Sequence, residues 1–459
     1  MNKMRLLVLI LGCLWIAKPD LMALNLTFKT KVESSRAQKS TKLTGSQNKT
    51  ALSHAKLTKI LKLLKQLKQS PYSHIKRNPF SLWTIENLKN IKVLSLKNIQ
   101  FTDASLKELS VLTSLTHLNL SGTKITDTGL KELSALKSLT HLSLLNTKIT
   151  YLGLEKLIEL KSLTHLHLGR TKVTDASLKG IGSLEALEYL DLSFTKINGA
   201  GLKELRALTH LTHLDLHKTA ITNSGLSQIG SLKHLTHLNL SFTKISDAGL
   251  KNLDTLAQLT HLDLLKTEIS DAGLINLKPL TNLTQLTLAQ TKINGSGFNG
   301  LAIPSLTHLD LSQTDFNNTS LKNIKSLRSL THLNLSNTVI SDSGLKELKT
   351  LIPLTHLDLN ETKITNSGLK YLQSLPSLTH LDLYGTDISN SGLKYLSALT
   401  NLVSLGLNRT MITGLGLKEL RTLQLLTHLV LPVSPNLTEL DIQNLKRVMP
   451  SCNIQKSPY

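Results

Sequence analysis

The sequence predicts an α/β solenoid, a horseshoe with a parallel concave sheet and short convex helices. A unit of 24 residues, L-T-H-L-x-L-x-x-T-x-I-x-D-x-G-L-x-x-L-x-x-L-x-x, recurs from Ile91 to Leu431, and its plainest copy begins at Leu115. Self-similarity at a period of this size is typical of a solenoid, in which each unit covers the apolar face of its neighbour. The leucine spacing changes from two to three residues within the unit, which indicates a strand followed by a helix.

The first half of each unit is the expected strand. Leu118 and Leu120 alternate with polar residues, so we expect both leucines in the core and His117, Asn119 and Ser121 on the outer surface. Neighbouring units then stack their strands in parallel, about 4.8 Å apart. About 14 full repeats and a truncated one should give about fourteen strands, along an arc of roughly 65 Å.

The second half of each unit turns and returns on the convex side. The Thr column that begins at Thr123 should satisfy backbone groups of the turn with its hydroxyls. Asp127 lies where it could cap a helix N-terminus, accepting from backbone N–H groups near Gly129 and Leu130. Leucines at 130, 133 and 136 then form the buried stripe of a short helix.

One repeat departs from the 24-residue period. The copy from Leu283 to Leu306 has 23 residues, lacks one near Leu301–Ile303, and carries Pro304 in its convex segment. We expect a local 3₁₀ turn there with a small change in curvature.

These motifs resemble the leucine-rich repeat family over about three quarters of the chain. The I-T-D-x-G-L half is similar to the subtype shared by eukaryotic F-box/leucine-rich-repeat proteins and many exported bacterial proteins. The chain has Thr123 where the F-box subtype has Cys or Asn, and the sequence upstream contains no F-box-like segment. These departures, together with the closing segment Leu445–Ile454, bring the chain closest to the exported bacterial members.

The resemblance implies a non-enzymatic, exported interaction module that binds a protein or glycan ligand on its concave face. An alternative is an effector or adaptor that acts in a host cell and is related to ubiquitin ligases, as F-box/leucine-rich-repeat proteins are. The expected parts are an export segment, 1–23; a basic flexible linker, 24–54; an amphipathic helix with an N-terminal cap, 55–90; the repeats, 91–431; and a C-terminal cap, 432–459.

The N-terminus has the pattern of a secretory signal peptide. Lys3 and Arg5 precede an apolar run from Leu6 to Ala17, which is too short to span a bilayer. Cleavage near Ala23 would give a secreted or cell-envelope protein. Two alternatives stay open, a lipoprotein attached through Cys13 and an uncleaved anchor.

The N-terminal arm carries most of the positive charge. Residues 1–90 contain 17 Lys/Arg and 3 Asp/Glu, a net +14 of the +22 of the whole chain. Between Ala55 and Gln69, leucines and an isoleucine at helical spacing alternate with lysines, which predicts a basic amphipathic helix. Its lysines could contact an anionic membrane surface or simply face solvent on a capping helix; they are Lys56, Lys59, Lys62, Lys65 and Lys68. The segment Ala55–Gln69 contains no Phe, Trp or Tyr, which argues against nucleic acid as a partner.

The sequence contains no motif for catalysis or for a cofactor. Phosphate-binding glycine loops, zinc-protease helices and cysteine pairs are missing. Only Cys13 and Cys452 are present, and Cys13 lies in the export segment, so the mature chain has no cysteine pair for an internal disulfide. His-Asp-Ser triples recur in several repeats and therefore lack the singular arrangement that a nucleophilic site needs. We expect a non-enzymatic protein with no cofactor.

Eleven of the 17 histidines share one strand position. They are His117, His141, His165, His213, His237, His261, His308, His332, His356, His380 and His428. Three interpretations compete: repeat duplication of a residue that packs well, divalent-metal binding between neighbours, and pH sensing by groups that titrate together near pH 6. The sequence singles out no pair as a metal site.

A basic–aromatic alternation interrupts the repeat at the position before the Thr column. Elsewhere this position is mostly Gly, Asn or Gln, but five successive repeats carry Arg170, Phe194, Lys218, Phe242 and Lys266. Such an alternation at the edge of the concave sheet suits a partner contact, or else the two rings fold over the adjacent turns. Three further candidates enrich the same zone: His167, Tyr189 and His217.

The helix in the arm yields a prediction about membranes. If its lysines bind lipid headgroups, vesicles with anionic lipid should retain the protein at low salt and release it as salt screens the charges, as measured by co-sedimentation. Replacing the five lysines by glutamine should abolish this retention. Equal binding to neutral vesicles, or binding to neither kind, would leave the capping role.

Overall fold

The computed structural model describes Thr58 and residues 90–457. The signal segment, the linker 24–54 and most of the expected helix Ala55–Gln69, including its five lysines, lie outside the described residues. Thr58, within that expected helix, is helical and exposed. The predictions made for this arm stay predictions.

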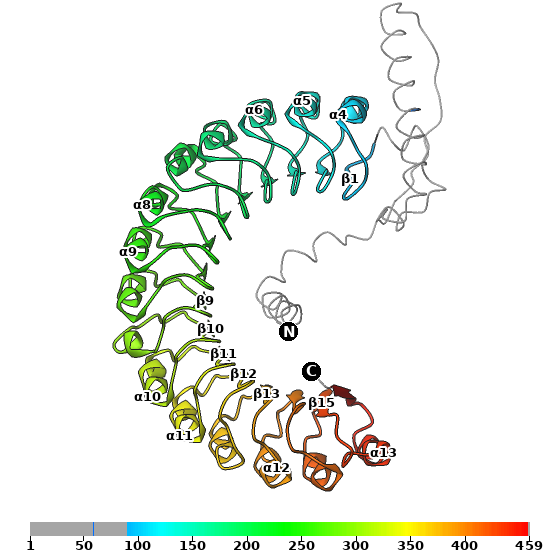
Figure 1. The fold of residues 1–459 in the computed structure, drawn as a ribbon, viewed down its shortest axis with the longest axis vertical. Helices are drawn as coiled ribbons and strands as arrows, with labels where there is room; N and C mark the ends of the chain where they lie inside the picture. The colour runs from blue at the N-terminus through cyan, green and yellow to red at the C-terminus, as the bar shows by residue number, and fades with distance from the viewer. Residues whose placement is uncertain (1–57, 59–89, 458–459) are drawn as a thin grey trace, which may run out of the picture. The chain divides into compact units, whose positions relative to one another are not determined.

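Every repeat contributes one short strand to a single parallel sheet on the inner side of an arc, and helices cover the outer side (Figure 1). Described residues form sixteen strands, paired in chain order. They are β1 (Val93–Ser95), β2 (His117–Asn119), β3 (His141–Ser143), β4 (His165–His167), β5 (Tyr189–Asp191), β6 (His213–Asp215), β7 (His237–Asn239), β8 (His261–Asp263), β9 (Gln285–Thr287), β10 (His308–Asp310), β11 (His332–Asn334), β12 (His356–Asp358), β13 (His380–Asp382), β14 (Ser404–Gly406), β15 (His428–Pro432) and β16 (Asn453–Ser457).

The register is constant, so equivalent residues of neighbouring repeats lie side by side: His213 pairs with His237, and Asp215 with Asn239. The predicted horseshoe and its strand phasing are confirmed. The expected number of about fourteen strands was too low, because the truncated repeat adds β15 and the C-terminal cap adds β16, which pairs with it.

Six convex segments begin with one turn of α-helix and continue as 3₁₀-helix, and five others are 3₁₀-helix alone. The α-helices are α4 (Asp103–Leu106), α5 (Asp127–Leu130), α6 (Tyr151–Leu154), α7 (Leu178–Ile181), α8 (Asn223–Leu226), α9 (Asp247–Leu250), α10 (Asn318–Leu321), α11 (Asp342–Leu345), α12 (Asn390–Leu396) and α13 (Glu439–Val448). The 3₁₀-helices are η3 (Lys107–Val111), η4 (Lys131–Ala135), η5 (Asp175–Ser177), η6 (Leu202–Ala207), η7 (Ile229–Ser231), η8 (Lys251–Leu253), η9 (Asp271–Leu277), η10 (Ser296–Phe298), η11 (Lys322–Ser326), η12 (Lys346–Thr350), η13 (Leu369–Ser374) and η14 (Gly414–Thr422). A 3₁₀-helix has three residues per turn, so leucines spaced by three fall on one buried side.

One continuous apolar core lies between the sheet and the helices. In the plainest repeat Leu118, Leu120, Ile125, Leu130 and Leu133 are all buried, and the same positions are buried along the array. At the C-terminal end, Cys452 is buried in this core, and burial raises the pKa of its thiol. This agrees with an inert capping residue. Among described residues, no helix has the length and apolar character to cross a membrane.

The Thr column satisfies the turn, as predicted. Thr123 Oγ1 donates a 2.6 Å hydrogen bond to the carbonyl of Leu120, and Thr243 Oγ1 does the same to Leu240. Both hydroxyls are buried. The column therefore anchors the end of each strand to its own turn.

The predicted cap by Asp127 was wrong. Asp127 begins α5, and its carboxylate faces the next repeat, where it accepts from Thr150 N at 2.8 Å and Thr150 Oγ1 at 2.5 Å. Asp342 binds Thr365 N and Oγ1 in the same way, at 2.8 and 2.6 Å. The Asp of one repeat therefore braces the turn of its neighbour.

The glycine of the D-x-G-L motif makes room for this brace. A Cβ atom on Gly368 would lie 2.3 Å from Asp342 Oδ1, and one on Gly129 would lie 2.3 Å from Asp103 Oδ1. Ser105, Ser177 and Ser320 replace this glycine in three repeats, of which the one with Ser105 is the first. Ser177 and Ser320 each follow a repeat that lacks the acidic or amide brace and has Tyr151 or Gly295 instead. The two positions are thus coupled across the repeat boundary.

The short repeat has its 3₁₀-helix at η10, upstream of the expected place, and Leu301–Ile303 form no 3₁₀ turn. Phe298 takes the place of the usual leucine and is fully buried. Its ring meets Phe316 edge to face, with 6.2 Å between ring centroids. The larger side chain fills core volume where the shorter segment supplies less.

The coupled pair can be tested by a double-mutant cycle. Gly368→Ser should lower the free energy of unfolding by about 1–3 kcal/mol, because the new side chain collides with Asp342. In an Asp342→Gly background, which reproduces the natural Gly295–Ser320 pair, the same substitution should cost less, with a coupling of about 0.5–3 kcal/mol. Urea unfolding followed by circular dichroism measures all four proteins. Additive effects would contradict the coupling.

Candidate functional site

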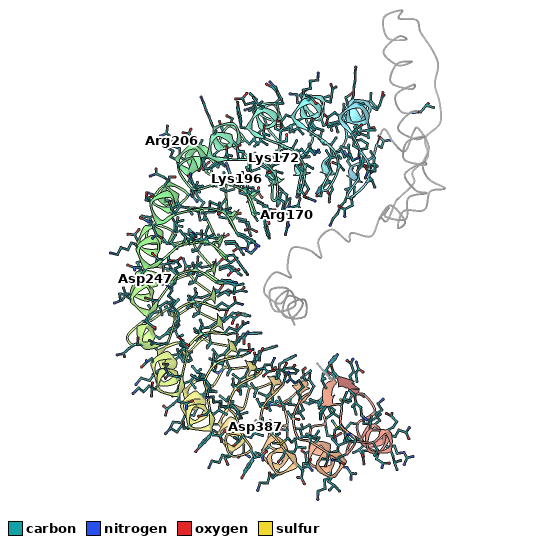
Figure 2. All side chains as sticks on the ribbon, in the orientation of Figure 1. Arg170, Lys172, Lys196, Arg206, Asp247 and Asp387 are labelled. Carbon is teal, nitrogen blue, oxygen red and sulfur yellow. The ribbon has the colours of Figure 1, made fainter. Side chains whose placement is uncertain are left out.

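The candidate site lies at the edge of the concave sheet, where each strand turns outward. Residues at this position adopt a left-handed backbone in repeat after repeat; Arg170, Phe194, Lys218, Phe242 and Lys266 have φ between 53° and 57°. We call these five residues the lip stripe. Gly122 and Gly385 occupy the same position elsewhere, with φ of 67° and 64°. Figure 2 shows Arg170 on the inner side of the arc and Arg206 on the outer side.

The left-handed backbone is imposed by hydrogen bonds between repeats. Phe194 N donates to the carbonyl of His217, and Phe242 N donates to that of Leu265, both at 2.8 Å. A residue other than glycine pays about 1–3 kcal/mol for this conformation. Glycine or asparagine would be less costly here than phenylalanine. Phenylalanine therefore makes the folded backbone less stable at these two positions than glycine would, which points to a role for the two rings.

The stripe is a continuous row of cation–π contacts. Arg170 Cζ lies 3.8 Å from the centroid of the Phe194 ring, and Lys218 Nζ lies 5.1 Å from it. Lys218 Nζ and Lys266 Nζ lie 6.0 and 5.2 Å from the Phe242 centroid. Both rings are half-buried and all three cations are exposed. The rings thus pack within the row, as the alternative interpretation expected, and the charges still face solvent.

His217 joins the two phenylalanines. Its ring meets Phe194 and Phe242 edge to face, at centroid distances of 4.9 and 5.1 Å. Its Nδ1 lies 2.7 Å from Ser241 Oγ. Burial and the charge of Lys218 lower the pKa of His217, so it is neutral at pH 7.

The other two candidates form a second group on β4 and β5. The ring centroids of His167 and Tyr189 are 4.8 Å apart, and His167 Nδ1 lies 3.6 Å from Asp191 Oδ2. Burial would raise the pKa of Asp191, but hydrogen bonds from His167 and Ser193 outweigh it and hold the pKa below its usual value. All eight candidates thus lie within five successive repeats.

The Asp/Asn column next to these residues has a structural role. Asp215 Oδ1 accepts from the N–H of His217 at 2.7 Å, and Asp263 Oδ1 accepts from Leu265 at 2.9 Å. Each carboxylate therefore closes the turn of its own repeat. Burial raises the pKa of Asp215 to about 7, helped by the charge of Asp191, and raises that of Asp263 to about 6.

The eleven histidines of one strand position form what we call the imidazole ladder. Neighbouring rings stack nearly parallel, with 3.9 Å between the centroids of His213 and His237, and of His237 and His261. Gln285 and Ser404 interrupt the stack, whereas Tyr189 replaces a histidine and stacks on His165 and His213 with 5.7 Å between centroids. Because parallel rings direct their lone pairs along parallel lines, two neighbours do not converge on one ion. No group of three or more potential metal ligands occurs among the described residues.

Titration near pH 6, one of the three interpretations, does not apply to four rings of the ladder. Burial, followed by repulsion from His213 and His261, lowers the pKa of His237 to about 3. The same causes lower the pKa of His332 to about 3 and those of His141 and His356 to about 4. These rings are neutral at physiological pH.

Two features of the same edge were not predicted from the sequence. Arg409 Nη1 donates to Glu361 Oε1 at 3.0 Å and to Tyr384 Oη at 2.9 Å, reaching across the repeat that has Gly385 at the lip position. Glu361 and Arg409 are the other charged residues at the position of the lip stripe. Their departure from the usual Gly, Asn or Gln could have identified this contact from the sequence. An exposed lysine also follows the Thr column in seven repeats: Lys124, Lys148, Lys172, Lys196, Lys244, Lys292 and Lys363.

Known proteins share this architecture. A family model described as a leucine-rich repeat region matches residues 73–228 and 167–392. An internalin from Listeria monocytogenes is 25% identical, with a TM-score of 0.55, over 70% of this chain and 88% of that chain. A leucine-rich repeat protein from Leptospira interrogans is 23% identical, with a TM-score of 0.56, over 80% and 96%.

More distant structures share the fold alone. Mouse RP105, solved in complex with MD-1, is 21% identical with a TM-score of 0.50, over 78% of this chain and 74% of that chain. No curated protein matches the sequence.

The lowered histidine pKa values predict a pH dependence of stability. The folded protein holds His237 neutral down to about pH 3, whereas the unfolded chain protonates it below about pH 6.5. Between these values unfolding takes up protons, so His237 makes the protein less stable as pH falls. His237→Gln, which copies Gln285 of the same column, should therefore reduce the loss of melting temperature on acidification.

The raised pKa of Asp215 acts in the opposite direction, because the folded protein is then protonated more readily than the unfolded chain. The melting temperature of the His237→Gln variant is therefore compared with that of the parent at each pH from 7 to 4. Parallel melting-temperature curves would contradict the lowered pKa of His237.

Proposed function

The chain belongs to the leucine-rich repeat family, whose fold is a non-enzymatic protein-interaction scaffold, and from this premise we propose that it is an exported module that binds an extended anionic chain along the lip stripe. The observation that carries this proposal is the pair Phe194 and Phe242, held in a left-handed backbone between three exposed cations. Aromatic and arginine residues are the usual anchors of interfaces.

The spacing of the stripe favours an extended ligand. Like groups recur in every second repeat, so the three cations lie about 10 Å apart along the arc. Lys172, Lys196 and Lys244 are exposed two positions after Arg170, Phe194 and Phe242 and add positive charge to the same turns. An anionic polymer can contact several of these cations at once, so contacts that are weak singly together give a higher affinity.

Export is supported by the sequence of the N-terminus alone. A cleavable signal peptide fits the charged start, the short apolar run and a cleavage position near Ala23. Attachment of a lipid to Cys13 is the alternative. N-terminal sequencing of the native protein after cell fractionation distinguishes secreted, lipidated and anchored forms. The cell envelope or the medium is the proposed location.

The stripe can be tested with labelled poly-L-glutamate and polygalacturonate, two carboxylate polymers, by titration with fluorescence anisotropy at physiological salt. Phe194→Ala and Phe242→Ala should each weaken binding of whichever polymer the protein prefers by about 2 kcal/mol, or roughly 30-fold. Gln313→Ala and Asn337→Ala, at the same position of later repeats, should have little effect.

Phe194→Gly is the control that separates a loss of binding from a loss of stability. Glycine removes the backbone cost of the left-handed position and also removes the ring contacts, so the free energy of unfolding should change by no more than about 1 kcal/mol. Weaker binding by this stable variant would assign the ring to the ligand. If the Phe variants bind like the parent, the stripe serves only to pack the turns.

A further inference from the structure

A row of carboxylates lies beside the lip stripe, on the concave side of the same repeats. Constant register pairs Asp191 on β5 with Asp215 on β6. Asn239 on β7 pairs with Asp215 on one side and with Asp263 on the other. Asp191 is buried, and the other two carboxylates are half-buried. We call Asp191, Asp215 and Asp263 the acidic row.

Hydrogen bonds join the acidic row to the lip stripe. Asp215 Oδ1 accepts from the N–H of His217 at 2.7 Å, and the carbonyl of His217 accepts from Phe194 N at 2.8 Å. Lys218 follows Asp215 by three residues, so their backbones are at most about 11 Å apart. The same spacing separates Asp263 from its own lip lysine. An anionic group bound at either lysine is therefore close enough to be repelled by a charged carboxylate of the row.

The charge of the acidic row depends on pH. Burial, and after it the charge of Asp191, raises the pKa of Asp215 to about 7, and burial raises that of Asp263 to about 6. Both side chains therefore lose negative charge as the pH falls from 8 to 5.5. Burial would also raise the pKa of Asp191, but hydrogen bonds from His167 and Ser193 hold it below its usual value, so Asp191 stays charged.

Other charged and titratable groups lie around the two carboxylates that gain protons. On the same side of β5, β6 and β7 and in the adjoining turn, the groups near Asp215 are Tyr189, Asp191, His213, His217, Lys218 and His237. Those near Asp263 are His237, His261, Lys266 and, beyond β9, Asp310. A histidine that gains a proton also favours an anionic ligand. The contribution of Asp215 is therefore isolated by substituting Asp215 alone.

We propose that the acidic row, while it is charged, weakens the binding of an anionic chain to the lip stripe, and that protons taken up by Asp215 and Asp263 strengthen this binding as the surroundings become acidic. This inference rests on the proposed function and adds its regulation. With an effective dielectric constant of about 20 near a protein surface and about 0.1 M salt, a unit charge about 10 Å away changes an affinity roughly threefold.

Asparagine can replace the carboxylate without loss of the turn, as Asn239 shows in the same column. Asn239 Oδ1 accepts from Ser241 N at 2.9 Å, as Asp215 Oδ1 accepts from the N–H of His217 at 2.7 Å. Asp215→Asn therefore keeps the hydrogen bond of the turn and removes the charge at every pH.

Asp358 provides the matched control. It occupies the same column on β12, beside Asp382, as Asp215 lies beside Asp191. Its Oδ1 accepts from Asn360 N at 2.9 Å, and burial, with the charge of Asp382, raises its pKa to about 7. Six strands along the sheet from β6 is roughly 29 Å, well beyond the screening length of about 10 Å in 0.1 M salt.

The probe is labelled dextran sulfate, whose sulfate groups stay charged between pH 8 and 5.5, and binding is measured by fluorescence anisotropy in about 0.1 M salt. The parent should bind more tightly at pH 5.5 than at pH 8. Asp215→Asn should bind about twofold to fivefold more tightly than the parent at pH 8 and match it at pH 5.5. Asp358→Asn should match the parent at both pH values, and melting temperatures confirm folding. The N-terminal arm is the same in every variant, so differences between variants report the concave face.

Two other outcomes overturn the inference in distinguishable ways. If Phe194→Ala weakens binding but Asp215→Asn matches the parent at pH 8, or Asp358→Asn gains as much as Asp215→Asn, the stripe binds the polymer and the acidic row does not regulate it. If Phe194→Ala and Lys218→Gln bind like the parent at both pH values, the proposed function fails together with the inference.

Discussion

The structure depends on hydrogen bonds that each repeat makes to the next repeat. Thr116, at the start of β2, donates its hydroxyl to the carbonyl of Lys92 in the preceding repeat, and Asp127 accepts from Thr150 in the following one. The core leucines of each repeat are also covered in part by a neighbouring repeat. The side-chain braces, the backbone ladder and the core all run in the same direction, along the array. A single repeat therefore has no independent stability, and the ends need caps, of which α13 and β16 form one.

The same regularity defines where a ligand can be recognised. Because the register is constant, each position of the repeat becomes a column on the surface, and a column of identical residues is uniform along the arc. Specificity then requires departures from the repeat. Phe194 and Phe242 are such departures, at a backbone position that suits glycine better. The imidazole ladder is the opposite case, a column in which the same residue recurs and its rings stack on one another.

Much of the fold and of the candidate site could be predicted from the sequence, because a strict period assigns every residue to a column. The strands, the buried leucines and the grouping of the eight candidate residues followed from that phasing. The partner of Asp127 did not, because Thr150 is 23 residues away and the local helix offers a plausible cap. The neutrality of His237 depends on burial and on repulsion between stacked rings, which spacing alone does not quantify. The contact of Phe298 with Phe316 depends on core volume around a deletion.

The pairing of Gly368 with Asp342 has a consequence for how such arrays grow. Repeat proteins lengthen by copying units, and the new junction must be compatible on both sides. A unit with serine in place of the glycine, as at Ser320, fits only behind a unit without the acidic brace, such as the one with Gly295. Units of this chain are therefore not freely interchangeable modules.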